Sequence, residues 1–72
     1  MKNSSFYEIR IKDHLNDTIA SWFEDLTVSN QEDGETVLSG SLPDQAALQG
    51  VLNRISSLGL TLISVNSVQE ED

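Results

Sequence analysis

Residues 26–42, LTVSNQEDGETVLSGSL, decide the fold, because they predict a β-hairpin in the middle of the chain. Asp33-Gly34 is a strong turn signal, since both residue types tolerate the backbone angles that close two antiparallel strands. It lies between a polar strand-like segment near 26–31 and the more apolar segment ETVLSGSL. The stretch therefore predicts two antiparallel strands joined by a tight turn.

A strand and then a helix are expected before the hairpin. FYEIRIK, residues 6–12, alternates, with Tyr7, Ile9 and Ile11 on one face and Phe6, Glu8, Arg10 and Lys12 on the other. From residue 15 the apolar period becomes that of a helix, and we assign to the core the stripe Leu15, Ile19, Trp22, Phe23 and Leu26. Asn16 or Asp17 is the expected N-cap.

A second helix and a last strand are expected after the hairpin. Asp44 is a suitable N-cap, and Gly59 stands where a glycine ends a helix in a left-handed turn. The apolar stripe between them is Ala47, Leu48, Val51, Leu52, Ile55 and Leu58. Gly50 inside this helix suggests close packing at that position. LTLISV, residues 60–65, reads as a fourth strand that stops at Asn66.

The resulting order, β-α-β-β-α-β, predicts an α+β fold of the ferredoxin-like split type. Because β-α-β crossovers are right-handed in nearly all cases, this order favours a four-stranded antiparallel sheet with two helices on one face. We expect one domain over residues 6–68, a disordered N-terminal tail over 1–5 and an acidic C-terminal tail over 69–72.

Composition excludes several classes of function. The chain has 72 residues, four Lys plus Arg against twelve Asp plus Glu, a net charge of −8 and a pI near 4.2. Nucleic-acid binding requires basic surface, which this chain mostly lacks. No Cys is present, so disulfides and thiolate zinc sites are excluded. We expect no membrane span, no signal peptide, no metal and no cofactor, and therefore a small, acidic, soluble domain.

The open face of the sheet is expected to be partly apolar. The last strand has apolar residues on both faces, and other strands have apolar residues opposite their main apolar set. A contiguous patch on so small a domain suggests that a partner covers it. We therefore expect a homodimer, or an unidentified protein partner, bound through an edge strand or through the patch formed by Phe6, Val37, Ile63 and Val65.

Three basic side chains at alternate positions, Arg10, Lys12 and His14, form a candidate site for an anionic ligand or a partner. The alternative is that they only balance nearby acids on a solvated face, which we favour. His14 follows Asp13, a pairing that suits acid/base catalysis, but no nucleophile accompanies it, so we assign no catalytic residue. The acidic run 32–35 does not fit a calcium loop, and we assign no metal ligand.

The strings YEIRIK-x-HL, WFEDLTV, ETVLSG-x-x-PDQAALQGVLNRI and LGLTLISV resemble a family of short, uncharacterised bacterial proteins with no established activity. They cover nearly all of residues 7–65. The resemblance implies a bacterial, cytoplasmic protein. The usual form of the family has Gly where Asp13 stands and His where Gln49 stands, which weakens any site built on two imidazoles.

Three functions remain open. The first is a non-catalytic protein-interaction or regulatory module. The second is a small-ligand sensor resembling ACT regulatory domains, with its ligand near the loop at 12–16, although that loop lacks the Gly common there. The third is a dimeric α+β-barrel enzyme with His14 at its rim. RNA binding on the sheet is discarded for lack of stacked aromatics and positive charge.

Overall fold

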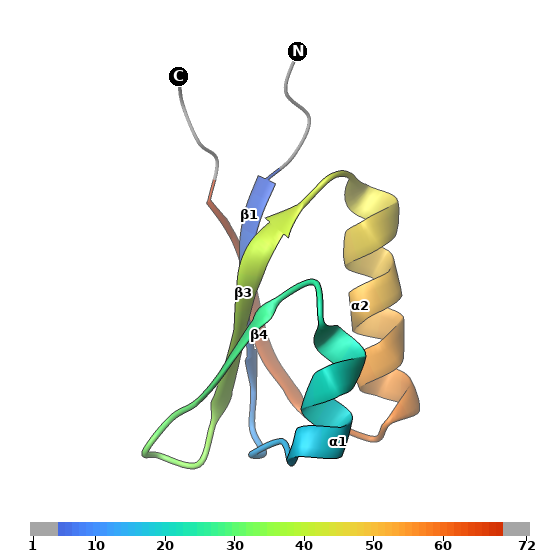
Figure 1. Ribbon diagram of the computed structural model, residues 1–72. Helices are drawn as coiled ribbons and strands as arrows, with labels where there is room; N and C mark the ends of the chain where they lie inside the picture. The colour runs from blue at the N-terminus through green and yellow to red at the C-terminus, as the bar shows by residue number, and fades with distance from the viewer. Residues whose placement is uncertain (1–4, 69–72) are drawn as a thin grey trace.

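The strands expected from the alternating and apolar segments pair into one antiparallel sheet in the computed structural model, which describes residues 5–68. In chain order the elements are β1 (Ser5–Ile11), α1 (Asp17–Ala20), the 3-10 turn η1 (Ser21–Phe23), β2 (Thr27–Asn30), β3 (Thr36–Leu42), α2 (Gln45–Ser57) and β4 (Leu62–Val68). The strand order is β2-β3-β1-β4, and both helices lie on the same side of the sheet (Figure 1). The predicted α+β class, with a four-stranded antiparallel sheet and two helices, is confirmed.

The predicted tails at 1–5 and 69–72 lie outside the described residues, except for Ser5, which is the first residue of β1. Between residues 5 and 68, no helix is long and apolar enough to cross a membrane.

β1 is a central strand and carries the middle of the core. It pairs antiparallel with β3 on one side and with β4 on the other. Residues that stand opposite one another share a face of the sheet, so Val28, Leu38, Ile9 and Val65 form one apolar row across all four strands. Ile9 and Leu38 are completely buried. The bounds of the predicted strand at 6–12 are therefore correct to within one residue at each end. Its predicted apolar face is the face that packs on the core.

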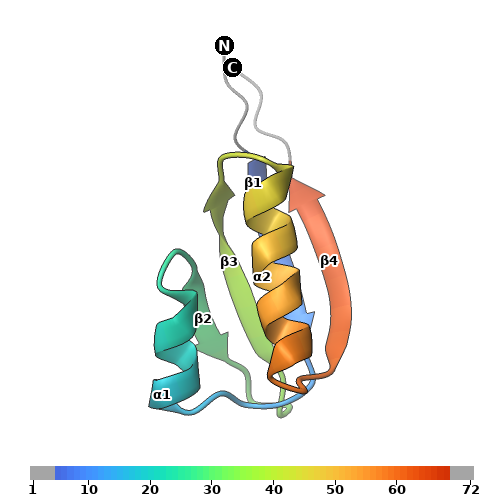
Figure 2. The same ribbon diagram turned by 90° about the vertical axis from the view of Figure 1, so that its right-hand side faces the viewer.

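The core lies between this face of the sheet and the helices, and its buried members come from both helical segments and from β1, β3 and the loops around α1. Figure 2 shows α2 lying along the sheet and α1 beside β2. The buried cluster consists of Ile9, Ile11, Leu15, Phe23, Leu26, Leu38, Leu42, Val51 and Ile55.

The first helix is shorter than predicted. Asn16 is its N-cap and accepts a hydrogen bond from the Ile19 N–H at 2.9 Å, but after Ala20 the chain tightens into η1. In a 3-10 turn, neighbouring side chains point about 120° apart, so adjacent residues cannot both face the sheet. Phe23 is 1% exposed, whereas Trp22 is 48% exposed. The assignment of Trp22 to the core is therefore wrong.

The hairpin forms where the Asp-Gly signal predicts it. β2 and β3 pair with Asn30 opposite Thr36, and the Gln31 N–H donates to the Glu35 carbonyl at 2.6 Å across the loop. Gly34 has φ +91°, a left-handed conformation that glycine adopts without steric cost. The loop between Gln31 and Glu35 is thus longer than a two-residue turn, and Gly34 is the residue before Glu35.

The ends of α2 follow the predicted capping. The Asp44 carboxylate accepts a hydrogen bond from the Ala47 N–H at 2.8 Å. At the other end Gly59 has φ +74°, and its N–H and that of Leu60 return to carbonyls in the last turn of the helix. This pair of bonds is a Schellman motif, which satisfies carbonyls that the helix leaves without partners.

β4 begins later than predicted and continues past Asn66. Its register on β1 shifts, because Ile11 stands opposite Leu62 but Arg10 stands opposite Ser64. Ile63 is the extra residue of this β-bulge. In a strand without a bulge, Leu62 and Val65 would lie on opposite faces of the sheet. Because of the extra residue, both stand opposite residues of β1 that face the helices.

Two glycines differ sharply in their surroundings. A Cβ on Gly40, in β3, would lie 3.0 Å from Leu26 Cδ2 and 3.3 Å from the Asp25 carbonyl oxygen, and the φ of Gly40 is +156°. A Cβ on Gly50, in α2, would meet nothing within 4 Å. Close approach of the chain therefore requires glycine at 40, and the close packing expected at Gly50 is wrong.

We predict that Gly40→Ala lowers the free energy of unfolding by about 2 kcal/mol, because the methyl group overpacks against Leu26 and the backbone angle is strained. Gly50→Ala is the matched control and should raise the stability by about 1 kcal/mol through helix propensity. Urea denaturation of the two variants beside the wild type measures both effects. A Gly40→Ala protein as stable as the wild type would contradict the packing described above.

Candidate functional site

The loop between β1 and α1 is fastened to the hairpin by side-chain hydrogen bonds. The Asn30 side chain accepts from the Leu15 N–H at 3.3 Å and donates to the Leu15 carbonyl at 3.4 Å. The hydroxyl of Thr36 lies 2.7 Å from both the Asp13 carbonyl oxygen and Asn30 Oδ1, and it can donate its single proton to either oxygen. Thr36 is completely buried. The backbone of this loop is therefore held against the strands that flank the hairpin turn.

Two of the three basic residues expected to form one site, Arg10 and His14, are bound to different partners. The Arg10 guanidinium donates to Glu35 Oε1 at 3.1 Å, forming an ion pair whose side chains are 41% and 29% exposed. His14 Nε2 lies 2.6 Å from the Gln31 carbonyl oxygen, while Lys12 is exposed. Arg10 and His14 thus contact the two ends of the hairpin loop. Ion pairs this exposed contribute on the order of 0–1 kcal/mol, so their role in stability is small.

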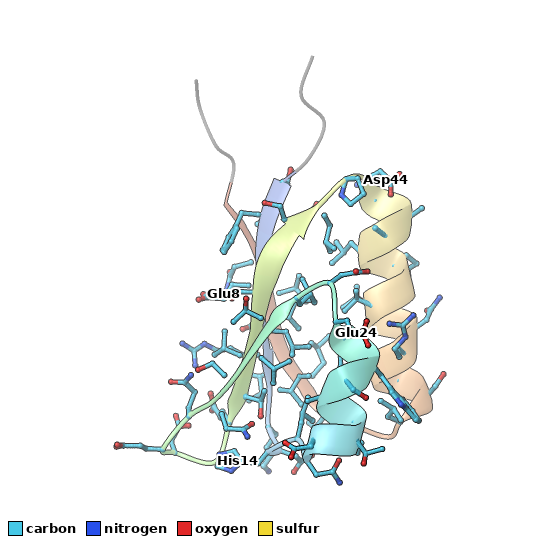
Figure 3. The ribbon with its side chains drawn as sticks, in the orientation of Figure 1. Glu8, His14, Glu24 and Asp44 are labelled. Atoms are coloured by element: carbon cyan, nitrogen blue, oxygen red, sulfur yellow. The ribbon has the colours of Figure 1, made fainter. Side chains whose placement is uncertain are left out.

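The ionisable side chains are spread over the fold. Figure 3 shows Glu8, His14, Glu24 and Asp44 on four separate parts of the molecule. Among residues 5–68, no group of three or more His, Asp or Glu side chains is arranged to hold a metal ion. Over the same residues, no buried side-chain polar atom lacks a hydrogen-bond partner.

The face of the sheet opposite the helices is lined mainly by small polar residues. Two of its cross-strand rows are Thr27-Ser39-Glu8-Asn66 and Ser29-Val37-Arg10-Ser64.

The apolar patch expected on this face is not contiguous. Phe6 and Val37 belong to the face, but the row that contains Glu8 separates them, and Val37 is only 8% exposed. Ile63 lies in the bulge at the edge of the sheet. Val65 packs against the core on the helix side, and its expected place on the open face is therefore wrong.

The two edges of the sheet differ in charge and length. β2 has four residues and is preceded by Glu24-Asp25 and followed by Glu32-Asp33. β4 has seven residues, LISVNSV, and none of them is charged. The charge-free stretch is longer than the strand and covers residues 55–69. Leu62 and Ile63, at the start of β4, are 44% and 45% exposed.

In the described part of the chain, β4 is an edge strand whose outward backbone groups pair with no other strand. The Lys12 N–H donates to the Thr61 carbonyl at 2.9 Å. Backbone direction alternates along a strand, so Arg10 and Glu8 also direct their N–H and C=O groups toward β4. Their partners in β4 are Ser64 and Asn66. The residues in between, Val65 and Ser67, therefore direct their N–H and C=O groups away from the sheet.

Sequence reasoning missed the exposure of Trp22, which it assigned to the core, and it made no assignment for Leu62. The Trp22 carbonyl accepts a hydrogen bond from the Arg54 guanidinium at 2.5 Å, which joins η1 to α2 and leaves the indole outside. The signal that could have located the β4 edge is the absence of charge over residues 55–69.

A family model described as a domain of unknown function (DUF8691) matches residues 6–66. No curated protein matches the chain. No solved structure matches it either. The family match covers every helix and strand named above except the first residue of β1 and the last two of β4.

We predict that Asn30→Ala lowers the free energy of unfolding by about 1–2 kcal/mol, because the backbone of Leu15 and the hydroxyl of Thr36 lose a partner. Ser29→Ala, at the neighbouring exposed position, should change it by less than about 0.5 kcal/mol. Chemical denaturation compares the two variants with the wild type. Equal stabilities would show that the loop does not depend on the Asn30 side chain.

Proposed function

This chain belongs to the DUF8691 family of domains of unknown function, and from that premise we propose that it is a non-catalytic protein-interaction module that binds extended segments along the edge of β4. The observation that carries the proposal is the chemistry of that edge. In a chain with twelve acidic residues, β4 is a seven-residue edge strand without any charge.

Exposed edge strands are normally protected. Free N–H and C=O groups in a row are a template for another strand, and proteins cover them, shorten them or place charges on them. The β2 edge follows this rule, because it is short and lies between two acidic pairs. At β4, only the bulge at Ile63 interrupts the edge, and it lies at one end. The segment from Ser64 to Val68 keeps a regular register on β1, and within residues 5–68 no strand pairs with its outer side.

Two exposed apolar side chains at the same edge support the proposal. Leu62 and Ile63 are each nearly half exposed. A bound strand would remove part of this apolar area from water, at roughly 25 cal/mol per Å². Backbone hydrogen bonds would provide the affinity and the side chains at the edge the selectivity, as in other cases of strand addition.

The other surfaces give less support to an interaction site. The open face is rich in Ser and Thr, and its apolar residues Phe6 and Val37 are separated. The ligand-sensor alternative places its ligand at the loop 12–16. There Asn30 and Thr36 already bind the backbone of Leu15 and Asp13. The β4 edge is therefore the surface we favour.

We further propose that the α+β arrangement is the ferredoxin-like split β-α-β-β-α-β fold. In its support, β1 and β2 flank β3, while β3 and β4 flank β1, so each helical crossover passes over one strand. The unusual feature is the first crossover, which keeps one turn of α-helix followed by η1. A cytoplasmic location and a bacterial source belong to the same proposal and rest on the sequence resemblance.

Amide hydrogen exchange tests the interaction at residue level. In dilute ¹⁵N-labelled protein, the amides of Val65 and Ser67 should exchange rapidly, because they point to solvent. In a native extract of the source cells, we expect their exchange to slow at least about tenfold as a bound strand protects them. Val28, which points outward from the β2 edge, is the internal control and should not change. Equal exchange of all three amides in buffer and extract would refute the proposed function.

A further inference from the structure

We propose that the occupant of the β4 edge is a second copy of this chain, paired antiparallel through β4 so that two four-stranded sheets join into one of eight strands. The inference rests on the proposed function, because it requires β4 to accept a strand. It adds the identity of the partner, the two-fold symmetry of the contact and its register.

Charge favours β4 as the place where two copies meet. Each chain has a net charge of −8, so most contacts between copies bring carboxylates together. Joining two β2 edges would bring together the acidic pairs 24–25 and 32–33 of both copies. Residues 55–69 carry no charge, so a β4–β4 contact places no ionised group opposite its own copy. Like charges directly opposite across strands are destabilising, and this edge avoids them.

The backbone determines which registers are allowed. Val65 and Ser67 direct their N–H and C=O groups outward, so a joining strand must present its own outward-directed residues opposite them. An antiparallel two-fold contact centred on Val65 satisfies this condition. The Ser64 N–H faces β1, so the Ile63 carbonyl, on the other side of the same trans peptide, points outward and can accept from Ser67. Val65 then exchanges two hydrogen bonds with Val65 of the second copy, and Ser67 stands opposite Ile63 of the second copy. This register also overlaps the whole of Leu62–Val68 with itself.

The same register continues both faces of the sheet. On the helix side, the apolar row Val28-Leu38-Ile9-Val65 would continue without interruption into the same row of the second copy. On the open side, Ser64 would stand opposite Asn66 of the second copy, a pair of uncharged side chains that can hydrogen-bond. The contact is isologous, so each residue pair occurs twice, as in closed two-fold dimers.

Two substitutions at one position test the pairing. Ser67→Pro removes an outward N–H without taking a bond from β1, and proline is tolerated at such positions of an edge strand. Ser67→Ala keeps the N–H and is the matched control. In sedimentation velocity from micromolar to millimolar concentration, we expect the wild type and Ser67→Ala to dimerise. Ser67→Pro loses two symmetry-related hydrogen bonds, so its dissociation constant should rise about 100-fold. Circular dichroism checks that the proline variant folds.

Disulfide capture tests the register. The chain contains no cysteine, so a Cys introduced on β4 has no competing thiol. Ser64→Cys and Asn66→Cys proteins, mixed and oxidised mildly, should form the mixed disulfide at least about tenfold faster than either forms its own homodimer, because positions 64 and 66 stand opposite in the proposed register. A dimer that gives no excess of the mixed disulfide overturns this register.

The outcomes separate this inference from the proposed function. A wild type that stays monomeric up to millimolar concentration overturns self-pairing. If Val65 and Ser67 are nevertheless protected in the cell extract, the interaction module stands and its partner is a different strand. If neither dimerisation nor protection occurs, both proposals fall. A dimer that Ser67→Pro leaves intact, in a folded protein, places the contact elsewhere and also overturns self-pairing.

Discussion

The pairing of β1 with both of its neighbours is the constraint on which the rest of the structure depends. Ile9 stands between Leu38 and Val65, and Ile9 and Leu38 are completely buried. Because β1 is central, its alternation determines which face of the whole sheet is apolar. β4 accommodates this alternation with a bulge at Ile63, which keeps Val65 in the core row.

The consequence of a central β1 is that β2 and β4 become the edges, and the sequence treats them unequally. β2 is short, lies next to the first helix and is surrounded by acids. β4 is longer, uncharged and preceded by the tight Schellman turn that closes α2. The charge-free residues 55–69 keep the β4 strand itself without the like-charge repulsion that acidic pairs produce at the β2 edge.

The polar network around Thr36 has a structural role. Thr36, Asn30 and the backbone of Leu15 form a compact set of hydrogen bonds that holds the β1–α1 loop to the hairpin. Arg10, on β1, and His14, in the loop after β1, contact Glu35 and Gln31 of the same hairpin. Arg10 and His14, which suggested a ligand site, are thus engaged with the hairpin, whereas Val65 and Ser67 of β4 direct their backbone groups outward.

Local signals in the sequence determined the element order, the caps and much of the core. Asp33-Gly34, Asn16, Asp44 and Gly59 act through their own backbone and side-chain preferences, which need no distant partner, so each could be identified directly. The buried face of β1 followed from strict alternation for the same reason. The candidate site was predictable only in outline: an edge strand was named among the alternatives, but its residues were not.

Only the tertiary structure decided the features that depend on distant partners. Trp22 lies outside because one narrow 3-10 turn can direct a single aromatic residue to the sheet, and Phe23 occupies that place. Val65 belongs to the core because the register on β1 includes an extra residue at Ile63. Gly40 is required because Leu26 returns across β3, while Gly50 faces open space. Short apolar segments have no internal signal for register or for the approach of a distant loop, and these are set by the packing of whole elements against one another.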